Sequence, residues 1–492
     1  MIRTPISTVS TARALNRSWL LLLALAGIAL IWADIHIYQV DPWAELGRML
    51  GGLLLPHWED VTTLWQAVGY TLSFALLAIA LSAPLGLLLA MMFRFRLVRH
   101  VCAAVRSVHE LFWGLILMQV YGLSATTGLL AIAVPFTGVF AKVFAEIFAQ
   151  QSTDPATTLG VKVNGLKRYA YSLIPQSWPA LTSYIRYRFE CALRSSAILG
   201  FIGLPTLGFH LETMFKQGHY AQAGALLWVF FVLIATLKYW LRPKLLPLYL
   251  IAAIFLLPDT IGFSNSGYFW QFISHDIWPK ALREGNWLSA WHWYADLFHG
   301  QIWQGVVQTL MLTQIALMLT LALVLLLYPL ASRRLSGPWL SRAGKCLLLV
   351  FRSTPEMMLA FIFLLQFGPS GLPAIIALAL HNGSLIAFLT GRASDAEPEH
   401  LHQRPDDPTG LLYYAYIETP RRFPALLALL FYRWELILRE SAIMGILGIT
   451  TLGFYIDSAF EEFRFDRAFV LIVVTAALNI AVDGLSRWLR RR

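Results

Sequence analysis

Long apolar runs separated by short polar stretches dominate the chain. A membrane-spanning helix needs about 20 mostly apolar residues, and twelve runs approach or exceed that length. They lie at about 18–35, 64–93, 102–121, 125–149, 178–200, 221–240, 245–262, 302–331, 346–367, 371–391, 423–448 and 467–488. We therefore expect an all-α, polytopic membrane protein with about twelve transmembrane helices.

The sequence also repeats itself at an offset of about 245 residues. Residues 165–209 and 410–454 align without a gap, and 23 of the 45 positions are identical. Two shorter motifs recur as well: Trp-Gln-x-Val-x2-Thr-Leu at 65–72 and 303–310, and Arg-Ser-x2-Glu at 106–110 and 352–356. The repeat predicts two tandem six-helix halves, residues 1–242 and 243–492, in the same orientation. Many transporters are built from such repeats around one site.

Composition agrees with a membrane protein and explains the basic charge. The chain is 58% hydrophobic and 13% charged, against about 25% charged in soluble domains, and its mean hydropathy is +0.61. A net charge of +10 is compatible with nucleic-acid binding in a soluble protein. Here the basic clusters all fall on one side of the twelve-span model, which is typical of cytoplasmic loops. The sequence therefore predicts cytoplasmic termini and no nucleic-acid partner.

The first apolar run follows basic residues, as a signal peptide would. Its counterpart at 245–262 lies deep inside the chain, where a signal peptide is excluded. We therefore interpret both as transmembrane helices. The three cysteines, Cys102, Cys191 and Cys346, show no metal-binding spacing and are interpreted as small buried residues.

Charged residues recur inside or beside the predicted spans, where ionised groups are costly. In half one they are Arg106, Glu110, Arg186, Arg188, Glu190 and Arg194, and in half two Arg352, Glu356, Arg433, Glu435, Arg439 and Glu440. Glu190–Arg194 and Glu435–Arg439 have the i,i+4 spacing of helical ion pairs. Arg188 lies about 160° around the helix from Glu190, since each residue turns about 100°, and therefore needs another partner.

The charges of the fifth and eleventh spans differ between the halves: half one has Arg186 and Ser195 where half two has Phe431 and Glu440. Half one therefore carries excess positive charge, which an anionic substrate is able to neutralise, because arginine matches phosphate-like geometry. The alternative is pairing between helices, with Glu110 or Glu356, and no substrate contact. Both interpretations stay open from the sequence.

Two polar segments, about 150–177 and 392–422, repeat a Tyr-Ala-Tyr motif followed by proline. The candidate residues are Gly165, Tyr169, Tyr171 and Pro175 in half one, and Gly410, Tyr414, Tyr416 and Pro420 in half two. A short helix in each segment would lie on the membrane surface, within reach of a soluble partner; the alternative is an ordinary amphipathic connector.

Glycines follow the charged residues in both halves. They are Gly200, Gly203 and Gly208, matched by Gly445, Gly448 and Gly453. Close helix packing and a helix end are both compatible with them.

The repeated run Tyr-Arg-x-Glu-x3-Arg-x-Ser-Ala-Ile-x-Gly-x2-Gly, together with the two polar segments, resembles the phosphonate-type branch of binding-protein-dependent ABC importer permeases. The sequence departs from the family pattern in four ways. Lys162 and Asp407 replace the glycine thirteen residues before the segment proline, and the acidic-Ala-Ala start of the segment motif is absent. His109 replaces the proline kept as Pro355, and half one has Pro135 near the position of a family histidine that half two keeps as His381.

The resemblance implies a type I ABC importer-like fold with two permease halves fused in one chain. It further implies uptake of a phosphonate- or phosphite-like oxyanion across the bacterial inner membrane. The implied partners are two copies of an ATP-binding subunit, which contact the two polar segments, and an extracytoplasmic substrate-binding protein.

No phosphate-binding loop of the type Gly-x4-Gly-Lys-Ser/Thr and no His-Glu-x2-His metal motif occurs in the sequence. We therefore expect no catalytic residue and no cofactor in this chain, with ATP and magnesium bound by partner subunits. A secondary transporter of parallel 6+6 repeats is the main alternative. A membrane-embedded enzyme is a further one, although no nucleophile, metal or acid–base cluster is visible.

Overall fold

The computed structural model describes residues 8–58, 61–151, 165–257, 266–396, 408 and 410–491. These residues form helices and contain no strand, which confirms the all-α class. By its internal contacts the chain divides into two compact units. The half-one unit is residues 48–278, and the half-two unit is residues 1–47 with 279–492.

Helices follow one another closely in both units. The half-one unit contains the end of α2 (Pro42–Leu54), then α3 (Val61–Met91), α4 (Arg96–Ser107), α5 (Glu110–Tyr121), α6 (Ala125–Ala149), α8 (Gly165–Arg168), η2 (Tyr169–Leu173), α9 (Ile174–Ile198), η3 (Leu199–Ile202), α10 (Leu207–Lys216), α11 (Tyr220–Ala235), α12 (Leu237–Trp240), η4 (Pro243–Leu245), α13 (Leu246–Leu256), α14 (Ser266–Gln271) and η5 (Phe272–Asp276). The half-two unit contains α1 (Thr8–Trp32), α15 (Lys280–Arg283), α16 (Trp287–Leu297), η6 (Phe298–Ile302), α17 (Trp303–Ala331), α18 (Arg333–Ser353), α19 (Glu356–Phe367), α20 (Gly371–Ala396), α21 (Gly410–Tyr413), η8 (Tyr414–Glu418), α22 (Thr419–Ile443), η9 (Met444–Leu447), α23 (Leu452–Glu461) and α24 (Phe465–Arg491).

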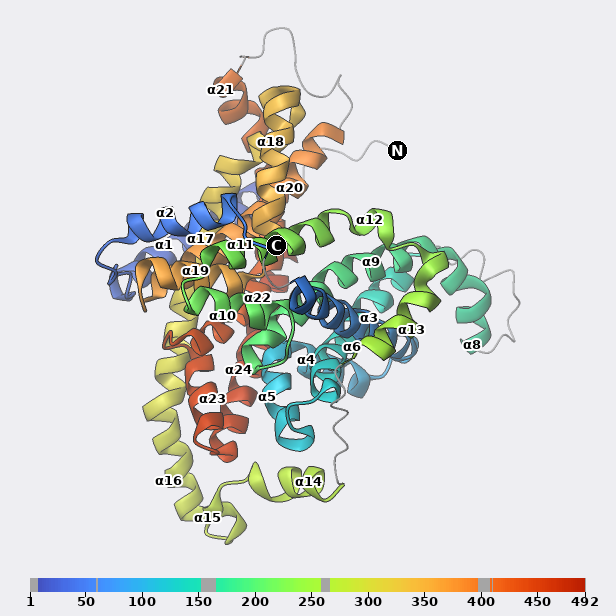
Figure 1. The fold of residues 1–492 in the computed structure, drawn as a ribbon, viewed down its shortest axis with the longest axis vertical. Helices are drawn as coiled ribbons and strands as arrows, with labels where there is room; N and C mark the ends of the chain where they lie inside the picture. Colours follow the sequence, from blue (N-terminus) through green and yellow to red (C-terminus); the bar gives the residue numbers. More distant parts are fainter. Residues whose placement is uncertain are drawn as a thin grey trace. The chain divides into compact units, whose positions relative to one another are not determined.

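The core of each unit is a small group of long helices. In the half-one unit α3, α6 and α9 pack on one another, as Figure 1 shows, with Phe74, Phe140 and Phe144 buried among them. In the half-two unit α17 packs on α18, α20 and α22. Because lipid is as apolar as these side chains, close packing rather than exclusion of water holds such helices together.

The first helix of each sequence half packs against a helix of the other half. Helix α1 lies against α17, and Gln314 Nε2 donates to the Leu22 carbonyl at 2.8 Å. Helix α13, its counterpart in the repeat, packs against α3. The contact units therefore differ from the predicted sequence halves, 1–242 and 243–492, which describe the repeat and stay a prediction.

Five described helices are long and apolar enough to cross a membrane, or up to nine if each bent helix pair is one span. Three shorter apolar stretches of helix fall below that length: Trp19–Trp32, which is part of α1, Tyr220–Ala235 and Pro243–Leu256. At 1.5 Å per residue a helix of 14 residues is about 21 Å long, short of a hydrocarbon core of about 30 Å. The membrane-spanning character is thus confirmed, whereas the count of twelve stays a prediction.

Two predicted straight spans, 102–121 and 346–367, are instead each broken into two helices. Helices α4 and α5 meet at 93°, and α18 and α19 meet at 92°. In half two the break is local chemistry: Pro355 follows Thr354, and a residue before proline is driven out of the helical region. In half one His109 takes the same extended conformation, with φ −68° and ψ 148°.

The glycines after α9 and α22 divide between the two predicted roles. Gly203 and Gly448 end the helices with φ of +93° and +84°, a region that glycine enters without strain. Gly200 and Gly445 instead lie against the backbone at Phe209 and Phe454. Close packing and helix termination are therefore both present, at different positions of one motif.

The threonine of the repeated Trp-Gln-x-Val-x2-Thr-Leu motif has a structural role in both halves. Thr71 Oγ1 on α3 accepts a hydrogen bond from Leu207 N, the first residue of α10, at 2.9 Å. Thr309 Oγ1 on α17 accepts one from Leu452 N, the first residue of α23, at 3.0 Å. The threonines just before α10 and α23 make no such side-chain cap. A neighbouring helix thus caps each short helix.

We expect Thr309→Val to lower stability by about 1–3 kcal/mol, because it leaves the buried Leu452 N–H without its acceptor. Thr313→Val is the matched control, since Thr313 Oγ1 only donates to the Thr309 carbonyl one turn away. Thermal unfolding in mild detergent measures both. Equal midpoints for the two variants would show that the interhelical cap does not stabilise this end of α23.

Candidate functional site

The breaks at 93° and 92° place a glutamate at the first position of a buried helix in each half. Glu110 begins α5 and Glu356 begins α19, and both are buried. The amino-terminal end of a helix carries partial positive charge, which favours a carboxylate there. The helix end therefore offsets part of the cost of burying each predicted intramembrane glutamate.

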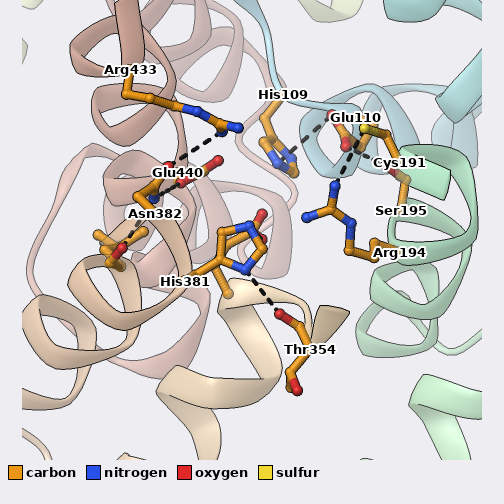
Figure 2. Close-up of polar contacts among 12 residues, drawn as sticks. His109, Glu110, Cys191, Arg194, Ser195, Thr354, His381, Asn382, Arg433 and Glu440 are labelled. Atoms are coloured by element: carbon orange, nitrogen blue, oxygen red, sulfur yellow. Dashed lines mark hydrogen bonds and ion pairs between the residues drawn. The ribbon is translucent and has the colours of Figure 1, made fainter. Parts of the chain in front are cut away.

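In half one Glu110 is held from two sides. Ser195 Oγ on α9 donates to Glu110 Oε1 at 2.6 Å, and His109 Nε2 lies 3.7 Å from Glu110 Oε2 (Figure 2). His109 Nδ1 accepts a hydrogen bond from Leu111 N at 3.2 Å and so caps α5. Ser195, noted in the sequence only as an uncharged counterpart of Glu440, is therefore a ligand of the buried carboxylate.

In half two a histidine again faces the buried glutamate, but it comes from another helix. His381 on α20 places Nε2 3.8 Å from Glu356 Oε2. Its Nδ1 donates to the Thr354 carbonyl at 3.0 Å, since a carbonyl oxygen only accepts (Figure 2). This bond fixes the imidazole across the break between α18 and α19.

Two matching positions of the halves thus carry a histidine and a proline in opposite order. Half one has His109 before its glutamate and Pro135 on α6, whereas half two has Pro355 before its glutamate and His381 on α20. The two departures from the family pattern are one reciprocal exchange, because both imidazoles turn Nε2 towards the buried carboxylate.

We expect His109→Pro to lower the unfolding midpoint, since it removes a helix cap with a contribution of about 1 kcal/mol and the imidazole beside Glu110. The double variant His109→Pro with Pro135→His installs the half-two arrangement, and we expect it to recover most of the loss. Thermal unfolding of both in detergent is the measurement. A double variant less stable than His109→Pro alone would contradict equivalence of the two positions.

A buried chain of polar contacts joins α20 to α22 in half two. Asn382 Nδ2 donates to Glu440 Oε2 at 2.9 Å, and Arg433 Nη1 donates to Asn382 Oδ1 at 3.3 Å (Figure 2). All three side chains are buried. Asn382 was missed by sequence reasoning, because only the packing of α20 on α22 brings it between Arg433 and Glu440.

The arginines of α9 have different surroundings. The Arg188 guanidinium lies over the Phe136 ring of α6, with 4.0 Å to the ring centroid. Arg194 Nη2 donates to Cys191 Sγ at 3.3 Å, one turn away, and Arg186 is exposed. A cation over an aromatic face is attracted by the ring quadrupole, although the ring does not neutralise its charge.

The remaining predicted charges also take part in contacts. The Arg352 guanidinium lies over the Phe388 ring at 4.5 Å. Arg106, Glu190, Glu435 and Arg439 each take part in polar or electrostatic interactions. The i,i+4 pairing of Glu190 with Arg194 and of Glu435 with Arg439 stays a prediction. Among the described residues no group of three or more His, Cys, Asp or Glu is arranged to hold a metal ion.

The described part of each polar segment runs directly into the following long helix. Gly165 begins α8 and Gly410 begins α21, and Pro175 and Pro420 lie in the first turn of α9 and α22, where the missing N–H of proline is tolerated. A separate short helix earlier in either segment would fall in residues 152–164 or 397–407, with Lys162 and Asp407, outside the described residues.

The two tyrosines of each Tyr-Ala-Tyr motif have different roles. Tyr169 stacks edge-on against Phe148, and Tyr414 stacks against Tyr328 and donates to the Leu325 carbonyl. The second tyrosines, Tyr171 and Tyr416, are each 74% exposed. The first tyrosine therefore anchors the segment, and the second is available to a partner.

In half two the polar segment also contains a buried ion pair, between Arg422 and Glu418, which was not predicted from the sequence. Arg422 Nε donates to Glu418 Oε1, and Ser394 Oγ on α20 donates to the same carboxylate oxygen at 2.8 Å. Half one has Leu173 and Ser177 at the matching positions. The i,i+4 spacing of Glu418 and Arg422 was the available sequence signal.

The chain is similar to known transport permeases. Residues 324–492 match the family model described as "Binding-protein-dependent transport system inner membrane component". The chain is 24% identical over 489 residues to a phosphate-import permease protein, PhnE, of Mycolicibacterium smegmatis, covering 92% of this chain and 90% of that protein.

Two shorter relatives match part of the chain. A phosphite transport system permease protein, PtxC, of Stutzerimonas stutzeri is 27% identical, over 31% of this chain and 57% of that protein. A putative cryptic phosphonate transport system permease protein, PhnE2, of Escherichia coli K12 is 30% identical, over 23% of this chain and 92% of that protein. No solved structure matches.

Proposed function

The chain belongs to the family of binding-protein-dependent transport system inner membrane components, and from this premise we propose that it imports a phosphonate-, phosphite- or phosphate-like oxyanion across a bacterial inner membrane. The observation that carries the proposal is the match over 92% of the chain to a phosphate-import permease. The related permeases are named for phosphate, phosphite and phosphonate, three tetrahedral oxyanions.

The buried arginines support an oxyanion as the substrate. Guanidinium groups present paired N–H donors that fit two oxygens of such an anion. In a region of low dielectric constant a charged donor attracts an anion more strongly than in water. The charged clusters around Glu110 and Glu356 lie on the helices that we propose to flank the substrate pathway.

ATP hydrolysis, in this proposal, takes place on partner subunits. Two copies of an ATP-binding subunit, each with ATP and magnesium, bind the segments around Tyr171 and Tyr416, whose exposure leaves them accessible. An extracytoplasmic binding protein delivers the anion to the opposite face, and both chain termini are cytoplasmic. Closure of the ATP-binding subunits switches the two halves between outward- and inward-facing states around a site at the repeat interface.

The first experiment is a stoichiometry. We expect the chain, purified in mild detergent from its native membrane, to carry two copies of a protein with a phosphate-binding loop for each copy of itself, as counted by native mass spectrometry. Recovery of the chain alone, with uptake driven by a proton or sodium gradient, would favour a secondary transporter instead.

A substitution tests the proposed role of the two segments. Tyr171→Ala combined with Tyr416→Ala removes two exposed rings and should leave the fold intact while uncoupling ATP hydrolysis from uptake. Tyr432→Ala, a change of an exposed tyrosine elsewhere on α22, is the control. A secondary carrier has no reason to depend on Tyr171 and Tyr416 more than on Tyr432.

A further inference from the structure

Arg188 and Arg433 occupy matching positions of the repeat but have different neighbours. The residue of α6 beside Arg188 is Phe136, whereas the matching residue of α20 beside Arg433 is Asn382. The next position that differs in charge is Ser195 in half one, where half two has Glu440. The same arginine is therefore built into two different electrostatic environments.

In half two the arginine is linked to a carboxylate through a neutral amide. Arg433 donates to Asn382 at 3.3 Å, and Asn382 donates to Glu440 at 2.9 Å (Figure 2). The amide thus links one cation and one carboxylate, all buried. A buried charge that is linked in this way has its desolvation cost offset, and Arg433 has little need of an external anion.

In half one the positive charge is not balanced by a direct contact. Among the described residues Arg188 has no hydrogen bond and no ion pair; its Nε is buried without a partner. The carboxylate of Glu110 is already held by Ser195 and His109. Arg188 as a whole is half-buried, and a partly desolvated cation without a hydrogen-bond or ion-pair partner is costly inside a membrane protein, where such residues are often functional.

The contact with Phe136 leaves Arg188 ready to bind an anion. A cation–π contact uses the face of the planar guanidinium, with 4.0 Å from its central carbon to the ring centroid. Hydrogen bonds to an oxyanion use the edges of the same plane. Phe136 therefore orients the guanidinium without occupying its donors, whereas Asn382 occupies a donor of Arg433.

We propose that Arg188 is the arginine that binds the transported oxyanion, and that Arg433 is a structural counterpart neutralised through Asn382 and Glu440. This inference rests on the proposed function and assigns anion binding to one half of the pseudo-symmetric chain. Duplication into one chain permits such a division, because the two halves then change independently, unlike the halves of a homodimer.

The test compares matched variants in the complex with its ATP-binding and substrate-binding partners, reconstituted in proteoliposomes. The probes are phosphate, phosphite and methylphosphonate. We expect Arg188→Gln to lower kcat/KM for uptake by about tenfold or more, the usual effect of losing a charge-assisted hydrogen bond. Arg188→Lys, which keeps the charge and loses the planar fork, should raise KM by a smaller factor.

The control is the double variant Arg433→Gln with Glu440→Ser, which removes both charges of half two and restores the half-one serine. We expect it to affect kcat/KM far less than Arg188→Gln. Ser195→Glu, which places a carboxylate on the α9 helix as in half two, should weaken uptake. Thermal unfolding and ATPase activity without oxyanion show whether each variant is assembled.

Two results would overturn the inference: normal uptake by an assembled Arg188→Gln complex, or a loss in the half-two double variant as large as in Arg188→Gln. If Arg188→Gln does not assemble, an unchanged KM in Arg188→Lys together with normal uptake in Ser195→Glu overturns it equally. A wild-type complex that transports none of the three probes overturns the proposed function itself, and the assignment of Arg188 with it.

Discussion

Replacing Gly445 with alanine is expected to abolish the folded protein. A Cβ at this position would lie 1.9 Å from Phe454 N and 2.4 Å from the Gly453 carbonyl carbon. Both atoms are backbone, so no side-chain rotation relieves the overlap. Overpacked cores usually lose about 1–3 kcal/mol, and a clash with fixed backbone should reach or exceed that range. The amount of monodisperse protein extracted from the membrane measures the effect.

Gly484→Ala provides the control for this result. Gly484 lies on α24 in the same unit, and a Cβ there meets nothing within 4 Å. Alanine also has a higher helix propensity than glycine, so this variant should be as stable as the wild type or slightly more so. A Gly445→Ala protein with normal yield and unfolding midpoint would mean that η9 and α23 separate without loss, contrary to the observed packing.

The second large effect is expected from Arg422→Ser in the polar segment of half two. Glu418 is 1% exposed, and without Arg422 its carboxylate keeps the Ser394 hydroxyl but loses the cation. Removing one partner of a buried ion pair typically costs about 3–5 kcal/mol. We therefore expect a large fall in the thermal unfolding midpoint, measured in detergent.

Half one supplies the matched control for this variant. The double change Glu418→Leu with Arg422→Ser installs the residues of half one, Leu173 and Ser177, both buried there. Replacing a whole buried pair by well-packed residues is often neutral, so the double variant should be more stable than Arg422→Ser alone. If the double variant is the less stable of the two, Glu418 and Arg422 stabilise the segment by separate contacts and not as a pair.

Much of the candidate site was predictable because its residue types are unusual for their surroundings. Charges such as Arg188 and Glu440 are visible in the sequence, since few charged residues interrupt its apolar runs. Their repetition at a constant offset also marks Glu110 and Glu356 as equivalent. The difference between Ser195 and Glu440 was likewise visible, whereas the Asn382 amide that links Glu440 to Arg433 was not.

The partners of these charges were not predictable, because they lie on other helices. Asn382 is one of several polar residues in the 26-residue helix α20, and nothing local distinguishes it until α20 packs on α22. The same holds for the exchange of His109 and Pro135 for Pro355 and His381. In the sequence these are two unrelated differences from the family pattern. In the structure both arrangements place a histidine Nε2 beside the buried glutamate.

The sequence by itself determined the all-α membrane class, the repeat and the family, because composition, apolar run length and repeated motifs are properties of the chain alone. Only the tertiary structure decided where spans 102–121 and 346–367 break, which helix supplies each ligand of the buried carboxylates, and that α1 packs with residues 279–492. These depend on side chains far apart in sequence meeting in a close-packed bundle, where position in space decides which groups pair.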